Sequence, residues 1–258
     1  MARRRPVDRT EPFLRRVLLQ EMPGDGLQTA FPWNTVAARA LHASGLELHP
    51  RCTFLVGANG SGKSTILEAI ATAAGLGERG GGSGFRGGGR EDERTLGDDL
   101  TLVRGARRPR GDFFLRAEGM LALADRLDEM RHEPWAGDVL GPYGGHSLNE
   151  QSHGESFLSI INHRLGPDGL YLLDEPESAL SPQSLLALIA RMDELASDGC
   201  QFIVATHSPI LLALPQSRIV EVSEQGLHEI AYDEVEAVSL TRLVLSDPAG
   251  MMRRLLDG

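Results

Sequence analysis

The stretch Gly57-Ala58-Asn59-Gly60-Ser61-Gly62-Lys63-Ser64-Thr65 decides how this chain folds. It matches the template of a phosphate-binding loop, in which a glycine is followed by four residues and then by Gly-Lys-Ser/Thr. The preceding residues 52–56 are apolar and rich in strand formers, whereas residues 66–74 favour a helix. The sequence therefore predicts a phosphate-binding loop between a buried strand and the N-terminus of a helix, rather than an ordinary glycine-rich turn.

The chemistry of such a loop is specific. Glycines let backbone N–H groups turn toward anionic oxygens, and the helix dipole adds partial positive charge. In this motif Lys63 reaches the terminal phosphates and the Ser64 hydroxyl ligates magnesium. Lys63 is the only lysine of the chain, all other cationic residues being arginines, and a compact ammonium suits a phosphate pocket.

The composition is that of an ordinary globular protein. The 258 residues suffice for one large domain, and the net charge of −10 argues against a generic polyanion-binding surface. Cys52 and Cys200 both begin apolar runs and are expected to be reduced core residues. The basic start at residues 1–6 is not followed by an apolar run, and no stretch is long enough to span a bilayer. We expect a cytoplasmic protein.

Strand-like and helix-like segments alternate along the chain, which predicts an α/β fold with a mainly parallel sheet and a ligand at the carboxyl ends of its strands. The expected strands are 14–20, 46–49, 113–117, 170–175 and 201–205, with a small strand pair at 218–222 and 226–230. The expected helices are 121–130, 154–165, 185–195, 239–245 and 251–256. We expect a single domain over 1–258, with residues 75–150 forming an inserted flexible loop and helical lobe.

Two acids follow the apolar run 170–173. Phosphoryl transfer needs a phosphate cradle, a magnesium shell, a positioned water and neutralisation of developing charge. Asp174 ends the expected strand, as an acid completing the magnesium shell should, and Glu175 is placed to orient or deprotonate the attacking water. Adjacent acids are common on surfaces, but the apolar strand before them and the phosphate loop upstream favour the catalytic interpretation.

Two further segments are candidates for phosphate contacts. His207 follows the next expected strand; a lone histidine is often structural, but this position favours contact with the γ-phosphate. Ser152, Gly154 and Glu155 lie just before an expected helix, where they form either an anion site or a plain N-cap.

Taken in order, these motifs resemble those of the ABC-type ATPase superfamily. The segments that match its Walker A, signature, Walker B, D-loop and H-loop elements are 57–65, 152–155, 170–176, 178–181 and 205–208. The chain looks similar to the small stand-alone "AAA family" ATPases of bacteria, which are related to ATPases of DNA repair and chromosome maintenance. The resemblance implies a P-loop NTPase fold with ATP and Mg²⁺ as ligands. It also implies that Gly57 to Thr65 contact ATP.

The sequence also departs from the pattern of the transporter ATPases. Its signature reads Gln-Ser-His-Gly-Glu instead of Leu-Ser-Gly-Gly-Gln, and there is no glutamine between Gln28 and Gln151 to supply a Q-loop. Glu118 either takes the place of that glutamine near magnesium or is an ordinary acid at a helix start. Because the Q-loop couples a transporter ATPase to its membrane partner, the absence of this glutamine argues against a transporter subunit.

The resemblance implies a mechanism in which two copies sandwich two ATP molecules. Ser152 and Gly154 of one copy would cap the γ-phosphate held by Lys63 of the other, forming a closed two-fold dimer. Hydrolysis by Glu175 would release the clamp.

Three functions compete. The first is a cytosolic ATPase of a DNA-repair or defence system with a separate effector protein. The second is the nucleotide-binding subunit of an ABC transporter, and the third is a non-catalytic nucleotide-switched interaction protein. The basic turn 104–110 is either a solvated loop or a contact to nucleic acid or an acidic partner. The aromatic turn 31–33 either packs beneath a loop or stacks on adenine.

Overall fold

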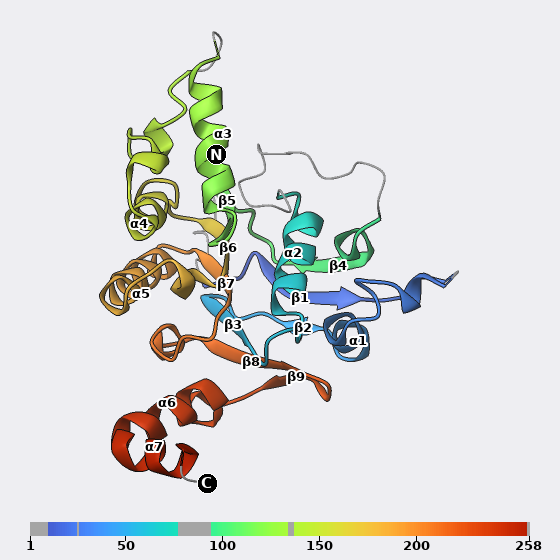
Figure 1. Ribbon diagram of the computed structural model, residues 1–258. Helices are drawn as coiled ribbons and strands as arrows, with labels where there is room; N and C mark the ends of the chain where they lie inside the picture. Colours follow the sequence, from blue (N-terminus) through green and yellow to red (C-terminus); the bar gives the residue numbers. More distant parts are fainter. Residues whose placement is uncertain (1–9, 25, 77–93, 134–136, 257–258) are drawn as a thin grey trace.

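The structure is a computed structural model of the chain and describes residues 10–24, 26–76, 94–133 and 137–256. Its centre is a six-stranded sheet with the strand order β5-β6-β7-β3-β8-β9 (Figure 1). All neighbouring strands are parallel except β9, which is antiparallel to β8, so the mainly parallel sheet and its small strand pair are confirmed. The strands are β3 Cys52–Val56, β5 Gly111–Arg116, β6 Gly169–Asp174, β7 Gln201–Ala205, β8 Arg218–Ser223 and β9 Gly226–Glu229.

A smaller antiparallel sheet packs beside the main one. It has the order β2-β1-β4 and consists of β1 Leu14–Leu19, β2 Leu46–Glu47 and β4 Leu100–Arg104. Helices cover the main sheet on both faces: α1 and α2 share a core with the small sheet, whereas α3, α4 and α5 pack on the opposite face. The helices are α1 Val36–Ala43, α2 Lys63–Ala74, α3 Met120–Arg131, α4 His153–His163, α5 Pro182–Ser197, α6 Glu236–Ser246 and α7 Pro248–Leu256.

The two cores follow from the alternation of side chains along each strand. In β6, Leu170 and Leu172 face the core with α1 and α2, whereas Tyr171 and Leu173 face the core with α4 and α5. Because both faces are covered, every residue of β6 is buried, which explains why its sequence reads as a continuous apolar run.

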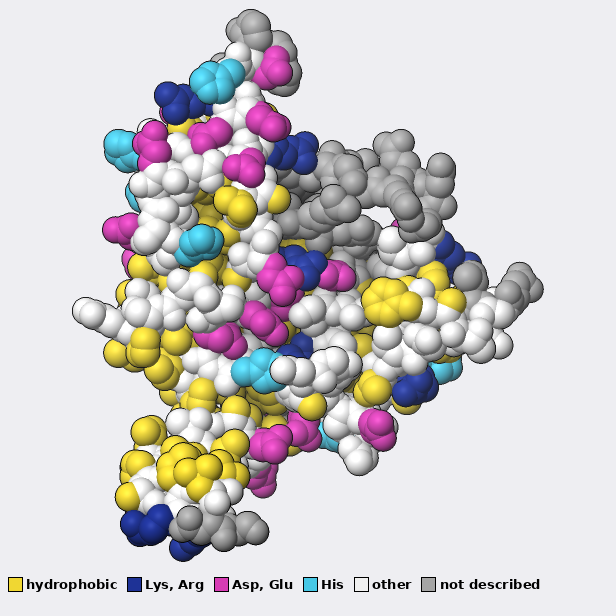
Figure 2. Space-filling view, in the orientation of Figure 1, with side chains coloured by type: hydrophobic (Ala, Val, Ile, Leu, Met, Phe, Trp, Pro, Cys, Tyr) yellow, Lys and Arg dark blue, Asp and Glu magenta, His cyan; other side chains and the backbone are white. Residues whose placement is uncertain are grey.

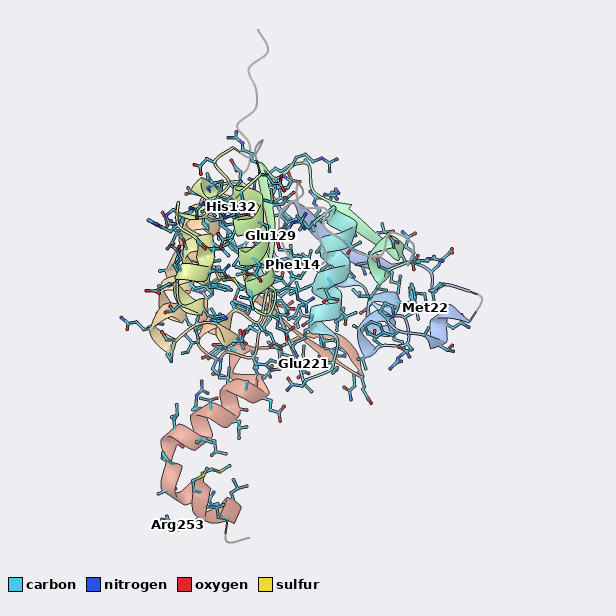
Figure 3. The ribbon with its side chains drawn as sticks, turned by 45° about the horizontal axis from the view of Figure 1, so that its top comes forward. Met22, Phe114, Glu129, His132, Glu221 and Arg253 are labelled. Atoms are coloured by element: carbon cyan, nitrogen blue, oxygen red, sulfur yellow. The ribbon has the colours of Figure 1, made fainter. Side chains whose placement is uncertain are left out.

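The two ends of the molecule differ in surface character. Acidic side chains gather over α3, and apolar side chains gather over α6 and α7 (Figure 2). Figure 3 places Arg253 at the far end of this C-terminal helix pair, well away from Phe114, which is buried in the main sheet.

The range 75–150, expected to form an inserted flexible loop and helical lobe, also contains β4 and β5, of which the sequence predicts β5 as the strand 113–117. β4 belongs to the small sheet, and β5 is an edge strand of the main sheet. The lobe therefore begins with α3 at Met120, because the strands before it complete both sheets. Most of the glycine-rich segment 75–90 lies outside the described residues.

The basic turn 104–110 is partly structural. The Arg107 side chain is 8% exposed and forms an ion pair with Asp168 at 2.6 Å. Its guanidinium also lies 4.5 Å from the centroid of the Phe13 ring and donates to the carbonyl of Gly199. Arg107 is therefore committed to the fold, whereas Arg104 is exposed.

Gln201 joins the two sheets. It is 1% exposed at the start of β7. Its side-chain oxygen accepts from the Leu14 N–H at 2.9 Å, and its amide nitrogen donates to the carbonyls of Leu14 and His49 at 2.8 and 3.0 Å. These contacts satisfy backbone groups of β1 that would otherwise be buried without partners.

We expect Gln201→Met to lower the free energy of unfolding by about 2–4 kcal/mol, because methionine has a similar size but leaves these backbone groups unpaired. Urea denaturation measures the change. Gln225→Met, in the exposed turn between β8 and β9, is the control and should stay within about 0.5 kcal/mol of the wild type. Equal midpoints for the two variants would contradict a bridging role for Gln201.

Candidate functional site

Strand register brings the candidate residues to one edge of the main sheet. Asp174 at the end of β6 lies opposite Arg116 of β5 and Ala205 of β7, and Ala205 lies opposite Leu55 of β3. The segments that follow β3, β6 and β7 therefore meet, and they contain the phosphate loop, Glu175 and His207.

The phosphate loop has a conformation that requires glycine at two positions. Gly57 has a φ of +138°, and a Cβ there would lie 2.4 Å from the carbonyl oxygen of Val222. Gly62 has a φ of +98°, and a Cβ there would lie 2.4 Å from the Cβ of Ala37. These constraints position the loop against β8 and α1 and turn it into the start of α2.

Lys63 is held at the mouth of this loop. Its Nζ donates to the carbonyls of Gly57 and Ala58 at 2.9 and 3.0 Å. Burial lowers the pKa of Lys63, and the nearby carboxylates of Glu175 and Asp174 oppose that shift. These two backbone carbonyls of the phosphate loop therefore orient the ammonium group of Lys63.

Ser64 and Asp174 form the adjacent polar pair. The Ser64 hydroxyl donates to Oδ1 of Asp174 at 2.9 Å. Burial raises the pKa of Asp174 to about 6, while the hydrogen bond from Ser64 and the charge of Arg116 oppose the shift. A hydroxyl beside a buried carboxylate is the oxygen donor set that Mg²⁺ prefers, so these residues fit the expected metal.

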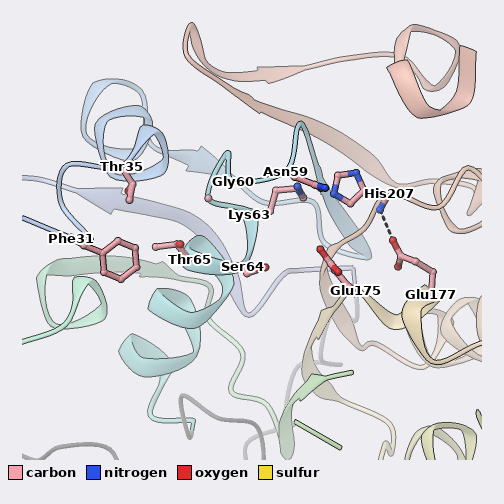
Figure 4. A pocket seen from close by; sticks show the side chains of 11 residues that line it. Phe31, Thr35, Asn59, Gly60, Lys63, Ser64, Thr65, Glu175, Glu177 and His207 are labelled. Carbon is pink, nitrogen blue, oxygen red and sulfur yellow. Dashed lines mark hydrogen bonds between the residues drawn. The ribbon is translucent and has the colours of Figure 1, made fainter. Parts of the chain in front are cut away.

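Glu175 and His207 face the same open cavity of about 710 Å³ as Lys63 and Ser64 (Figure 4). Nε2 of His207 and Oγ of Ser61 are buried and have no hydrogen-bond partner among the described residues. Unpaired donors beside a lysine suit the oxygen atoms of a phosphate. The cavity is lined by Phe31, Thr35, Asn59, Gly60, Gly62, Lys63, Ser64, Thr65, Glu175, Glu177 and His207.

The two aromatic residues of the turn 31–33 lie in different environments, one for each of the alternatives that the sequence left open. Phe31 is 70% exposed and lines the cavity, whereas Trp33 is 3% exposed and donates to Asp99 at 2.9 Å. Phe31 is thus the ring available to a nucleotide base, and Trp33 packs in the core.

The signature-like segment lies at the N-terminus of α4. The Ser152 side chain accepts from the Glu155 N–H, and the Glu155 carboxylate accepts from the Ser152 hydroxyl and N–H. These hydrogen bonds lower the pKa of Glu155. The N-cap interpretation therefore describes the structure, while Ser152, Gly154 and Glu155 are absent from the lining of the cavity. Their contact with phosphate stays a prediction.

Two polar residues beside the site were missed by sequence reasoning. Arg116 forms ion pairs with Glu68 of α2 and with Asp174, the latter at 3.5 Å. Glu177 accepts from the His207 N–H at 2.5 Å. The Asp-Glu-Pro-Glu run could have signalled Glu177, but only strand order reveals Arg116. Glu118 is 84% exposed, lies 3.7 Å from Arg116 and does not line the cavity.

The fold and this site define a P-loop nucleoside-triphosphatase domain. A family model described as "AAA domain, putative AbiEii toxin, Type IV TA system" matches residues 52–111 and 156–213. A macrolide export ATP-binding/permease protein MacB of Rhodopseudomonas palustris is 29% identical over 218 residues, which are 77% of this chain and 32% of that protein. A putative ABC transporter ATP-binding protein of Caldanaerobacter subterraneus is 29% identical over 213 residues, which are 74% of this chain and 84% of that protein. The chain thus spans about a third of the MacB relative.

Solved structures share the fold. The ADP conformation of an ATP-binding cassette from an ABC transporter superposes with a TM-score of 0.51 at 17% identity, covering 95% of this chain and 99% of that one. A nucleotide-free cassette gives 0.51 at 15% identity, covering 92% and 96%. In its motifs and in its match to the family model and these relatives, the chain is similar to the ATPase domains of the ABC superfamily. Across the described ranges, no helix has the length and apolar character needed to cross a membrane.

We expect Asp174→Asn to stabilise the metal-free protein, and to do so more at about pH 7.5 than at about pH 4.5. Folding raises the pKa of Asp174 from 3.8 to about 6. The stability that the buried, protonated carboxyl of Asp174 contributes is therefore complete below pH 3.8, the pKa of the unfolded state, and is lost as the pH rises through about 6, the pKa of the folded state. The difference between the two pH values should be on the order of 2 kcal/mol. Thermal unfolding in EDTA measures it, and a pH-independent difference would contradict the burial of this charge.

Proposed function

We propose that the chain, as a single ATPase domain, binds ATP with Mg²⁺ in the cavity beside Lys63 and hydrolyses it. The observation that carries this proposal is the Ser64–Asp174 contact at 2.9 Å, with Lys63 and Glu175 bordering the same cavity. This arrangement supplies a phosphate cradle, two metal ligands and an acid from three separate parts of the chain.

The residues divide the chemistry among them. Ser64 and Asp174 would hold Mg²⁺, which would offset the negative charge of the phosphates. Glu175 accepts a proton from the attacking water while the oxygen of that water forms a bond to the γ-phosphorus. The bond between the γ-phosphorus and the β–γ bridging oxygen breaks, which gives ADP and inorganic phosphate. His207 donates to a γ-phosphate oxygen through Nε2.

Glu175 has a backbone conformation that supports this role. Its φ is +48°, in the left-handed region, and its N–H donates to the carbonyl of Ala205 at 3.0 Å. A non-glycine residue held in this region costs free energy, which surrounding contacts must offset. Here the conformation turns the chain sharply at the end of β6, where the side chain enters the cavity (Figure 4).

We further propose that ATP draws two copies together, each completing the site of the other. Ser152 is exposed, and Ser152 and Gly154 lie outside the lining of their own chain's phosphate cavity. A second copy placed by two-fold symmetry could present them to the open side of that cavity. This separation supports a site shared between copies.

The biological setting that we propose is a cytosolic DNA-repair or defence system in which the ATPase acts on a separate effector. The description of the matching family model, with its putative toxin, supports a defence setting. The alternative, a transporter subunit, is favoured by the export and transport proteins among the relatives. Co-purification with a membrane protein would favour the transporter.

The first test is the mass of Glu175→Gln by light scattering. We expect the variant to retain ATP and become a dimer only with ATP and Mg²⁺, because loss of the proton acceptor blocks hydrolysis and preserves the clamp. Ser152→Asp in the same background keeps a good N-cap but adds a negative charge facing phosphate. It should bind ATP, keep its thermal stability and stay monomeric. Dimerisation of the Ser152→Asp variant would contradict the shared site.

The second test concerns Phe31. We expect Phe31→Ala to weaken ATP binding by roughly fivefold to tenfold, since a stacked ring contributes about 1 kcal/mol. Binding of inorganic triphosphate, which has no base, should not change. Titration calorimetry measures both. Equal weakening for ATP and triphosphate would show that Phe31 supports the loop instead of the base.

A further inference from the structure

Glu177 bridges two turns that border the cavity. It lies in the short 3₁₀ helix Pro176–Ser178, directly after β6, and its Oε1 accepts from the His207 backbone N–H at 2.5 Å. His207 belongs to the turn after β7. The nearest backbone link between these turns is the hydrogen bond from the Glu175 N–H to Ala205. Glu177 thus extends the β6–β7 connection beyond the end of the sheet.

This contact orients His207. Glu177 takes up the backbone N–H on one side of the residue, and the imidazole ring lies on the other side, toward Lys63 (Figure 4). Nε2 of His207 is buried and has no partner among the described residues. The hydrogen bond to the His207 backbone therefore fixes the position of the ring, and Nε2 is available to a ligand.

The second oxygen of Glu177 is also unusual. Oε2 is buried without a hydrogen-bond partner among the described residues, although Glu177 lines the cavity. Burying a carboxylate oxygen without full pairing costs free energy. The hydrogen bond through Oε1 needs an acceptor oxygen but no charge, so a neutral amide oxygen would accept the His207 N–H equally well.

We propose that Glu177 is a positioning residue for ATP hydrolysis, which holds the backbone of the turn after β7 so that His207 faces the γ-phosphate. The hydrogen bond through Oε1 does this work. The inference rests on the proposed function, because it assigns Glu177 a part in the same reaction. It also links the turn that follows Glu175 to the turn that contains His207, so the two catalytic side chains are set relative to each other.

The variants Glu177→Ala and Glu177→Gln separate this role from charge alone. Glu177→Ala should lower kcat by on the order of tenfold or more, with the dissociation constant for ATP changed less than about threefold. Glu177→Gln should retain most of kcat, because its amide oxygen still accepts the His207 N–H. Glu177→Asp, one methylene shorter, replaces the alanine variant if the latter does not fold. Glu224→Ala, in the exposed turn between β8 and β9, is the matched control.

A double-mutant cycle with His207→Ala identifies the route of the effect. If Glu177 acts through His207, Glu177→Ala should cost nothing further once His207 is alanine. Losses that multiply would overturn the proposal, as would a Glu177→Gln variant as slow as Glu177→Ala. A wild-type protein that does not hydrolyse ATP would instead refute the proposed function.

A measurement independent of activity tests the contact itself. In protein labelled with ¹⁵N-histidine, the His207 amide proton should resonate downfield, because it donates to a carboxylate. His207→Ala assigns the signal. Glu177→Ala should move it upfield by a large fraction of a ppm or more, and Glu224→Ala should leave it in place. An unmoved signal in Glu177→Ala would overturn the proposal whatever the turnover.

Discussion

The hydrogen bond between Ser64 and Asp174 is the contact on which the rest of the site depends. It joins the first turn of α2 to the end of β6, two strands away from β3 in the sheet order. Both residues are fixed by structure that cannot shift locally: the phosphate loop by the close approach of Gly57 to Val222, and β6 by two neighbouring strands. The Ser64–Asp174 hydrogen bond therefore depends on the relative positions of β3 and β6 in the parallel sheet.

The electrostatics of the site favour a cation together with an anion. Burial lowers the pKa of Lys63, and the negative charges of Glu175, Asp174 and Glu177 each act to raise it. A bare phosphate chain entering this cavity would meet more negative than positive charge. A phosphate chain with a divalent cation neutralises the carboxylates, and Asp174, whose pKa burial raises to about 6, gains most from such a partner. The acidic surroundings thus suit a metal–nucleotide complex.

Sequence predicted the parts of the site that are contiguous in the chain. The phosphate loop, the acids after β6 and the histidine after β7 each carry a local signal, because a strand, a turn and a polar residue follow one another. Arg116 and Glu177 carry a weaker signal, since their partners Asp174 and His207 lie in other segments. The same limit applies to residues 75–150, where β4 and β5 join sheets whose strand order cannot be read from local patterns.

Arg116 shows how the edge of the sheet connects to the lobe that begins at α3. It ends β5, and its guanidinium contacts Glu68 on α2 as well as Asp174 on β6. Glu68 comes four positions after Ser64, so both lie on one face of α2. The chain leaves Arg116 for α3 within a few residues. Any displacement of α3 relative to the sheet must therefore stretch the segment anchored beside the magnesium ligands, or first release the guanidinium from its two carboxylates.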